Sequence, residues 1–355
     1  MRLERSILLQ LLVGFAFAVA GMLFIALPGV AVAAIHKLPN VSILVLGRYI
    51  PLVLQNLAPY VLPIGFLLAV VSTYGRLAAD REWIAIQMAG IRPVKMLRPA
   101  LVLALVLAAF MHWLVAFELP HARKREQQFL LAAARSSIAN IAPGQNGLQL
   151  GDFSLNGFQD GDVFRDAYIH RAGKSGESGI DVFAKTAGLW LEGDVLFVHM
   201  TGVQNLGPGL GGKGDIAELS ARIPLKELIE QRKEDYDLPK YLTTLDMLRR
   251  LREEELPENR RRRYLFEVHE RLSVSLSFVL FLALGAATGL LMRRGTRLGA
   301  LAVSILYALI YYLFSEQLGK GLGRNQGLPP QVGAWATLGL GMVAGSILLR
   351  RALRR

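Results

Sequence analysis

The sequence contains no cysteine, so disulfide bonds, thiolate metal sites and cysteine nucleophiles are all excluded. Histidine is also scarce. The three in the middle of the chain, His121, His170 and His199, are far apart and lack the spacing of a metal-binding or catalytic motif. We therefore expect no metal, no cofactor and no enzymatic activity in this chain.

Charge is missing from long stretches near both ends, while 53% of the 355 residues are hydrophobic. A bilayer core needs about 20 apolar residues in helical form. Six stretches qualify or nearly do, three before a polar middle region and three after it. They are Ser6–Ile35, Tyr49–Thr73, Pro99–Phe117, Leu272–Met292, Leu298–Ser315 and Pro330–Leu349.

The net charge of +12 could suggest a nucleic-acid partner, but its location argues against one. Between Leu119 and Arg263 there are 21 Lys/Arg and 21 Asp/Glu, so the middle region is neutral. The excess lies around the apolar stretches, where basic residues mark the cytoplasmic side. The basic set comprises Arg2, Arg5, Arg76, Arg81, Arg92, Lys95, Arg98, Arg293, Arg294, Arg297, Arg350, Arg351, Arg354 and Arg355. Both termini are predicted to be cytoplasmic and the middle region periplasmic.

The middle region is expected to be mainly β. Alternating or β-rich runs, separated by Gly, Asn and Asp, extend from about Gly147 to Ala221 and favour a small β-sandwich or jellyroll. Helices are expected over Pro224–Arg232 and Leu242–Leu256. Gly207–Gly214 approaches a phosphate-binding loop but lacks its Ser/Thr and the following amphipathic helix, so no ATPase is expected in this chain.

A short charged segment, RLAADREWIAIQMAG, joins the second and third apolar stretches where a tight turn would suffice. Asp80 is a candidate cap for a helix, and Gly90 and Pro93 can end it. Leu77, Ile84, Met88 and Ile91 share one stripe, with Trp83 beside it, so residues 76–90 are predicted to form an amphipathic helix along the cytoplasmic surface. It could pack in the membrane interface or dock a cytoplasmic partner.

Three motifs in this order resemble the lipopolysaccharide export permease family (LptF/LptG). They are LPIGFLLAVVSTYGRLAADREWIAIQMAGIRP at 62–93, EVHERLSVSLSFVLFLALGAATGLLMRRGTR from Glu267, and LGKGLGRNQGLPPQVGAW from Leu318. The resemblance covers both apolar halves and implies the fold: an α-helical membrane protein with six transmembrane helices (3+3) and an inserted periplasmic β-jellyroll-like domain. The expected parts are residues 1–118, 119–263 and 264–355.

The resemblance also implies a mechanism. Two homologous permeases pair and sit on a cytoplasmic ABC ATPase dimer, which drives lipopolysaccharide from the inner membrane to a periplasmic jellyroll bridge protein. Residues 76–90 would be the coupling helix, and Glu82 would contact the ATPase, where a carboxylate can pair with an arginine. The expected coupling residues are Arg76, Asp80, Arg81, Glu82, Ile84 and Met88.

An anionic glycolipid needs cations near the outer membrane face. The candidates are His36, Lys37, Arg262, Arg263 and Arg271, although Arg271 could equally pair with Glu267, one helical turn earlier. The alternative function is a permease of another ABC system, which transmits ATPase-driven force to periplasmic partners without moving lipopolysaccharide.

Overall fold

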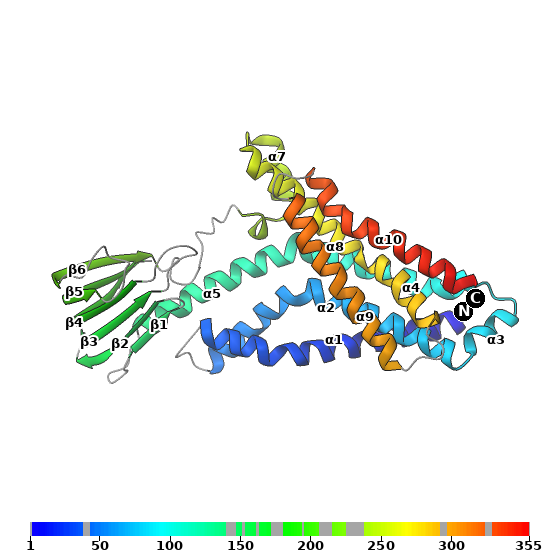
Figure 1. The fold of residues 1–355 in the computed structure, drawn as a ribbon, viewed down its shortest axis with the longest axis horizontal. Helices are drawn as coiled ribbons and strands as arrows, with labels where there is room; N and C mark the ends of the chain where they lie inside the picture. The colour runs from blue at the N-terminus through cyan, green and yellow to red at the C-terminus, as the bar shows by residue number, and fades with distance from the viewer. Residues whose placement is uncertain are drawn as a thin grey trace. The chain divides into compact units, whose positions relative to one another are not determined.

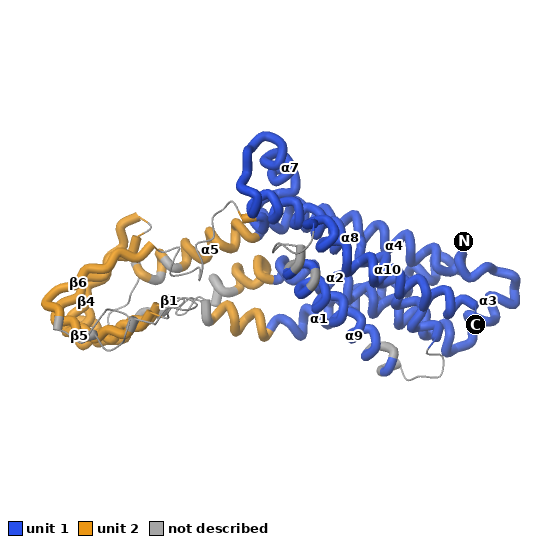
Figure 2. Tube along the Cα trace, turned by 45° about the horizontal axis from the view of Figure 1, so that its top comes forward, with its two compact units in different colours: residues 1–27, 54–122, 239–355 blue, residues 28–53, 123–238 orange. Residues whose placement is uncertain are grey.

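The computed structural model describes residues 2–37, 43–139, 147–150, 153–160, 163–171, 180–193, 195–205, 215–224, 238–291, 297–323 and 329–354. The phosphate-loop look-alike at Gly207–Gly214 lies outside these ranges, and of the helix expected over Pro224–Arg232 only Pro224 is described. The chain divides into two compact units (Figure 2). Unit 1 holds residues 1–27, 54–122 and 239–355, and unit 2 holds residues 28–53 and 123–238.

Along the sequence, helices come before and after a block of strands, as the colours in Figure 1 show. The helical elements are α1 (Arg2–Lys37), α2 (Ile43–Ala79), α3 (Glu82–Met88), α4 (Pro93–Trp113), the π-helical η1 (Leu114–Glu118), α5 (Leu119–Ala139), the 3-10 turn η3 (Pro239–Tyr241), α7 (Thr244–Glu253), α8 (Glu258–Leu291), α9 (Arg297–Phe314), the π-helical η4 (Ser315–Gly323) and α10 (Pro330–Arg354).

Five helical stretches among the described residues are long and apolar enough to cross a membrane. Four of the six predicted spans lie wholly within them, and Leu272–Met292 lies within them except for its last residue. The remaining prediction, Leu298–Ser315, coincides with α9, and the count of six stays a prediction. The five stretches are Leu3–Ile35, Gly47–Ala79, Pro93–Ala133, Glu258–Leu291 and Pro330–Arg354.

The third apolar helix runs well beyond its predicted end at Phe117. The chain continues through η1 into α5 without leaving a helical conformation, so the expected boundary after residue 118 falls inside this stretch. The sequence indicated an end there because charged residues begin at Glu118. Loss of apolar character marks the end of a hydrophobic span, but it does not stop the backbone hydrogen bonding of a helix.

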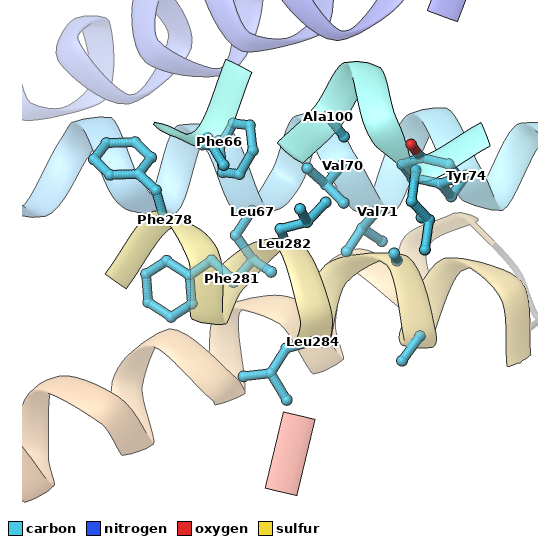
Figure 3. Packing of buried hydrophobic residues seen from close by; sticks show 14 of the residues in the cluster. Phe66, Leu67, Val70, Val71, Tyr74, Ala100, Phe278, Phe281, Leu282 and Leu284 are labelled. Carbon is cyan, nitrogen blue, oxygen red and sulfur yellow. The ribbon is translucent and has the colours of Figure 1, made fainter. Parts of the chain in front are cut away.

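The core of unit 1 lies where α2 and α8 pack together (Figure 3). Phe66 and Phe278 are fully buried, and their ring centroids lie 5.6 Å apart. Leu67 and Val70 of α2 face Phe281 and neighbouring apolar residues of α8 in the same cluster. Most of the apolar part of α8 is buried, and α4, α7, α9 and α10 all contact it, so α8 is the centre of the helical unit.

Glycines allow α2 and α8 to approach closely. A Cβ atom on Gly289 would lie 2.7 Å from the backbone nitrogen of Gly75 and 3.0 Å from the carbonyl oxygen of Val71. On Gly285 it would lie 2.9 Å from a methyl group of Val70. The spacing of Gly285/Gly289 and of Gly341/Gly345 predicts that helices pack closely at these glycines. The prediction is confirmed for both pairs, since Gly285 and Gly289 lie against α2, and Gly341 and Gly345 lie against α8.

Unit 2 contains a six-stranded antiparallel sheet with strands in chain order among the described residues (Figure 1). The predicted β structure of the middle region is confirmed, whereas the jellyroll-like arrangement stays a prediction. Leu131 and Ile138 of α5 pack into the buried side of the sheet. The strands are β1 (Gly147–Leu150), β2 (Phe153–Asp160), β3 (Val163–Arg171), β4 (Ile180–Glu192), β5 (Val195–Asn205) and β6 (Asp215–Pro224).

A polar cluster joins β3 and β4. The Tyr168 hydroxyl donates a hydrogen bond to Oδ1 of Asp181 at 2.7 Å, and Nδ1 of His170 lies 2.7 Å from the same oxygen. The hydrogen bond with His170, followed by that from Tyr168, lowers the pKa of Asp181 from its ordinary value of 3.8. These contacts favour the charged carboxylate in the folded state.

Acid should therefore weaken unit 2 partly through Asp181. Because its folded pKa lies below its unfolded value, the carboxylate stabilises the fold above pH 3.8, and this contribution is lost as the pH falls through the folded pKa. We expect Asp181→Asn to flatten the dependence of the melting temperature on pH below about 4. Glu218→Gln, an exposed change on the same sheet, is the control. An unchanged slope in Asp181→Asn would contradict this assignment.

Candidate functional site

The connection from α2 to α4 forms the candidate site. Helix α2 ends at Ala79, and Arg81 adopts a left-handed conformation with φ of 58° before α3 begins. The predicted helix over residues 76–90 is therefore two helices with a break between them, and Arg76 belongs to α2. Arg81 occupies the N-cap position without a side-chain cap bond, so the prediction that Asp80 caps the helix is wrong. Gly90, with φ of 81°, follows the end of α3 as expected.

Trp83 anchors α3 to the helical core. Its side chain is 1% exposed and meets Tyr74 edge to face, with ring centroids 6.2 Å apart. The Tyr74 hydroxyl donates a hydrogen bond to the carbonyl oxygen of Met96 at 2.9 Å, which ties α2 to α4 beneath α3. An aromatic side chain of this size buries a large apolar area. The short helix is therefore fixed to α2 directly, and to α4 through the hydrogen bond of Tyr74.

The opposite side of α3 is apolar and open. Met88 is 85% exposed and Ile84 is 40% exposed, while Val94 in the first turn of α4 is 70% exposed beside them in sequence. Arg81 and Glu82 are exposed as well. A solvent-directed group of large apolar side chains with charges of both signs is typical of an interaction surface. We call Arg81, Glu82, Ile84, Met88 and Val94 the α3 surface.

The α3 surface lies at the strongly basic end of unit 1. Both chain termini are near α3 in the two views (Figures 1 and 2), and Ile7, Trp83 and Ala352 share one hydrophobic cluster. The predicted clustering of basic residues from α1, α3–α4 and α10 at one end is therefore confirmed for the described residues. The exposed cations there are Arg5, Arg81, Arg92, Lys95, Arg98, Arg350, Arg351 and Arg354.

Two side chains of the segment from residue 76 to 90 have a buried donor atom. Nη2 of Arg76 and Nε1 of Trp83 are inaccessible to solvent and have no hydrogen-bond partner among the described residues. Buried donors without acceptors are costly, by about 1–3 kcal/mol each. Arg76 was an expected coupling residue, and the structure places it at the end of α2 rather than on the exposed side of α3.

Arg271 occupies a buried position with four protein acceptors. Its side chain is 3% exposed, and Nε donates to the Glu267 carboxylate at 3.3 Å. Nη2 donates to the carbonyl oxygen of Pro239 at 2.8 Å, and Nη1 to the carbonyl oxygen of Leu242 at 3.0 Å and the hydroxyl of Thr244 at 3.2 Å. Of the two roles that the sequence left open, pairing with Glu267 is the one observed. The guanidinium holds η3 and α7 against α8.

The other predicted lipid-binding residues lie in two places. Arg263 is exposed and Arg262 half-buried in the first turns of α8 in unit 1. His36 and Lys37 are the last two residues of α1, in unit 2, where the structure describes their backbone only. Within the described residues there is no group of three or more His, Asp or Glu side chains that could hold a metal ion.

Val94 is the site residue that the sequence did not single out, and Trp83 was placed beside the apolar stripe but not predicted to be buried. A Val directly after Pro93 in a basic loop is a usable signal, because Pro at the first helical position puts the next residue on an exposed first turn. No comparable signal separates the inward Trp83 from the outward Met88, since both are apolar and α3 has only seven residues.

The sequence was compared with models of known protein families. The model of the family described as lipopolysaccharide export system permease LptF/LptG matches residues 5–351, which is nearly the whole chain. Comparison with curated proteins gave no match. The family is one of transport permeases rather than enzymes, and its members are multi-pass proteins of the inner membrane, in agreement with the apolar helices. The chain therefore belongs to the LptF/LptG family of lipopolysaccharide export permeases.

Proposed function

We propose that this chain is a transmembrane subunit of an ABC exporter, and that a separate cytoplasmic ATPase dimer drives it through the α3 surface. The exporter extracts lipopolysaccharide, or a similar anionic glycolipid, from the inner membrane. The observation that carries the proposal is the two-sided character of α3. Trp83 is buried against Tyr74 of α2, which is hydrogen-bonded to α4, while Ile84 and Met88 are open to a partner.

Such an arrangement suits the transfer of motion. A partner that binds the outward side of α3 moves Trp83 as well, and Trp83 packs on Tyr74, which is bonded to Met96. Close-packed interiors deform little and transmit displacement to their neighbours. A shift of α3 therefore moves the ends of α2 and α4 together, and α2 in turn contacts α8 at Gly75 and Gly289.

The proposed orientation follows from charge. The basic end of unit 1, which holds the α3 surface and both termini, is on the cytoplasmic side. The sheet of unit 2 is then periplasmic, where it would meet a jellyroll bridge protein. A second homologous permease completes the lipid cavity, and His36, Lys37, Arg262 and Arg263 are the proposed phosphate contacts. Arg271 is omitted from this set because its donors are directed at protein acceptors.

Purification of the full-length, tagged chain from native membranes in mild detergent tests this function. We expect an ABC ATPase, a second permease and an anionic glycolipid to co-purify. Recovery of the ATPase with no glycolipid would favour the alternative, a permease that transmits force to periplasmic partners without moving lipopolysaccharide. The absence of any ATPase under conditions that preserve complexes would contradict both.

Charge reversal at Glu82 should weaken binding of the ATPase. Glu82 is exposed at the first position of α3, so Glu82→Arg leaves the Trp83 anchor in place while replacing a carboxylate that can pair with an arginine. Charge reversals of this kind in an interface cost about 2 kcal/mol or more, which predicts that the affinity for the ATPase falls by about thirtyfold or more. Quantitative mass spectrometry of the purified complex measures it.

Glu258→Arg is the matched control, because Glu258 is also exposed and also lies in the first turn of a helix, α8. It should retain the ATPase. Equal recovery of ATPase by both variants would show that Glu82 makes no contact of importance with the motor.

A further inference from the structure

The helix α7 has three distinct sides. It begins at the cap residue Thr243, whose hydroxyl accepts a hydrogen bond from the backbone nitrogen of Asp246 at 3.1 Å. Successive residues of an α-helix turn by about 100°, so the ten residues of α7 fall into groups about a third of a turn apart. The first side, with Thr244, Met247 and Leu251, packs against the rest of unit 1.

The second side is apolar and exposed. Leu245 is 62% exposed and Leu248 44% exposed, and Arg249 and Arg252 flank them at the spacing i, i+3, i+4 and i+7. The sequence stripe Leu245, Leu248 and Leu251 suggests one buried side. In the structure only Leu251 is packed, and the other two leucines face outward.

The third side is polar and carries charges of both signs. It is formed by Asp246, Arg250 and Glu253, and Arg250 is 3.9 Å from Glu254 in the following turn. One side of α7 thus packs against protein, the second carries exposed leucines and arginines, and the third carries charges of both signs. A helix lying in a membrane surface beside a transmembrane bundle has this composition.

The position of α7 in unit 1 is consistent with a location at the membrane surface. Arg271 holds the segment from Pro239 to Thr244 against α8, immediately before the apolar run of α8 begins at Leu272. Helix α7 also contacts η1, where the apolar part of the third long helix gives way to charged residues. The contacts with α8 and η1 therefore place α7 level with the ends of two hydrophobic spans, those of α8 and of the third long helix.

We propose that α7 is an interfacial helix that docks on the lipid surface, with Leu245 and Leu248 inserted among acyl chains and Arg249 and Arg252 directed at lipid phosphates. Arginine side chains reach phosphates from such a position by extending along the interface. Because the helix is bonded to α8 through Arg271, it fixes the depth of α8 in the bilayer. This role is independent of the ATPase and of the exported lipid.

The cysteine-free sequence allows a direct test with a single spin label. Full-length Leu248→Cys is labelled and reconstituted into vesicles of phosphatidylethanolamine and phosphatidylglycerol, and its collisions with oxygen and with a water-soluble nickel chelate are measured. We expect oxygen to dominate at position 248. Glu253→Cys, on the polar side of the same helix, is the control, and we expect the nickel chelate to dominate there.

Two results would overturn the proposal. Equal access of the nickel chelate to both positions would place the apolar side in water, and protection of position 248 from both reagents would place it against protein. Charge reversal of Arg249 and Arg252 to Glu tests the phosphate contact separately. It should lower oxygen access at position 248, and an unchanged value would overturn the assigned role of the arginines.

Discussion

Replacing Arg271 with methionine should destabilise unit 1 by about 3–5 kcal/mol, because it leaves buried acceptors without a donor. The substitution keeps the length of the side chain but removes every hydrogen bond to Pro239, Leu242, Thr244 and Glu267. The Glu267 carboxylate, 24% exposed, loses its partner as well. We expect a lower melting temperature and faster proteolysis between residues 238 and 258, measured on the purified chain in detergent.

Two further variants separate the bonding role of Arg271 from its charge. Arg263→Met removes an exposed arginine two turns earlier in α8 and should change the melting temperature little. Arg271→Lys keeps the charge but cannot reproduce the geometry of a guanidinium with donors on three nitrogens, so it should recover only part of the loss. Wild-type resistance to protease in Arg271→Met would contradict the structural role.

Replacing Gly289 with alanine should also destabilise unit 1. The added Cβ would lie 2.7 Å from the Gly75 nitrogen and 3.0 Å from the Val71 carbonyl oxygen. Both are backbone atoms, so no side-chain rotation can relieve the clash and α2 must move away from α8. Overpacking of this kind costs about 1–3 kcal/mol. In the proposed mechanism it also loosens the contact through which α2 moves α8, so ATP-driven transport should fall more than stability does.

Gly339→Ala in α10 is the matched control, since nothing lies within 4 Å of its Cβ. Alanine is the better helix former by about 1 kcal/mol, so this change should leave the melting temperature unchanged or raise it. A Gly289→Ala protein as stable and active as Gly339→Ala would show that α2 and α8 are not in close contact at this point.

Much of the fold follows from hydrophobic pattern. Apolar runs locate the long helices, because a bilayer requires about 20 such residues. The strand-like runs at residues 148–150, 162–169, 180–185 and 195–200 correspond to β1, β3, β4 and β5, whereas no such run was assigned to β2 or β6. In β2 the register shifts between Asn156 and Phe158, which interrupts the period of two. In β6, Ala217 and Ala221 weaken the contrast between the two sides of the strand.

Less of the candidate site than of the fold could be predicted from the sequence. The pattern located α3 and its exposed Glu82 and Met88, but it did not indicate that Trp83 faces the core. Seven residues make about two helical turns, and both sides of α3 are apolar. The bonds of Arg271 were equally hidden, apart from that to Glu267. Three of its acceptors come from residues about 30 positions earlier, which no local spacing can reveal.

The central claim is that a cytoplasmic ATPase binds the outward side of α3. Site-specific crosslinking tests it most directly, because a single cysteine can be placed in this cysteine-free chain. Met88→Cys and Val343→Cys, on the exposed side of α10, are each labelled with a photoreactive maleimide in native membranes. We predict an adduct with the ATPase from position 88 and none from position 343. Adducts from position 88 with lipid alone, as from position 343, would contradict the account and leave α3 as an interfacial packing helix.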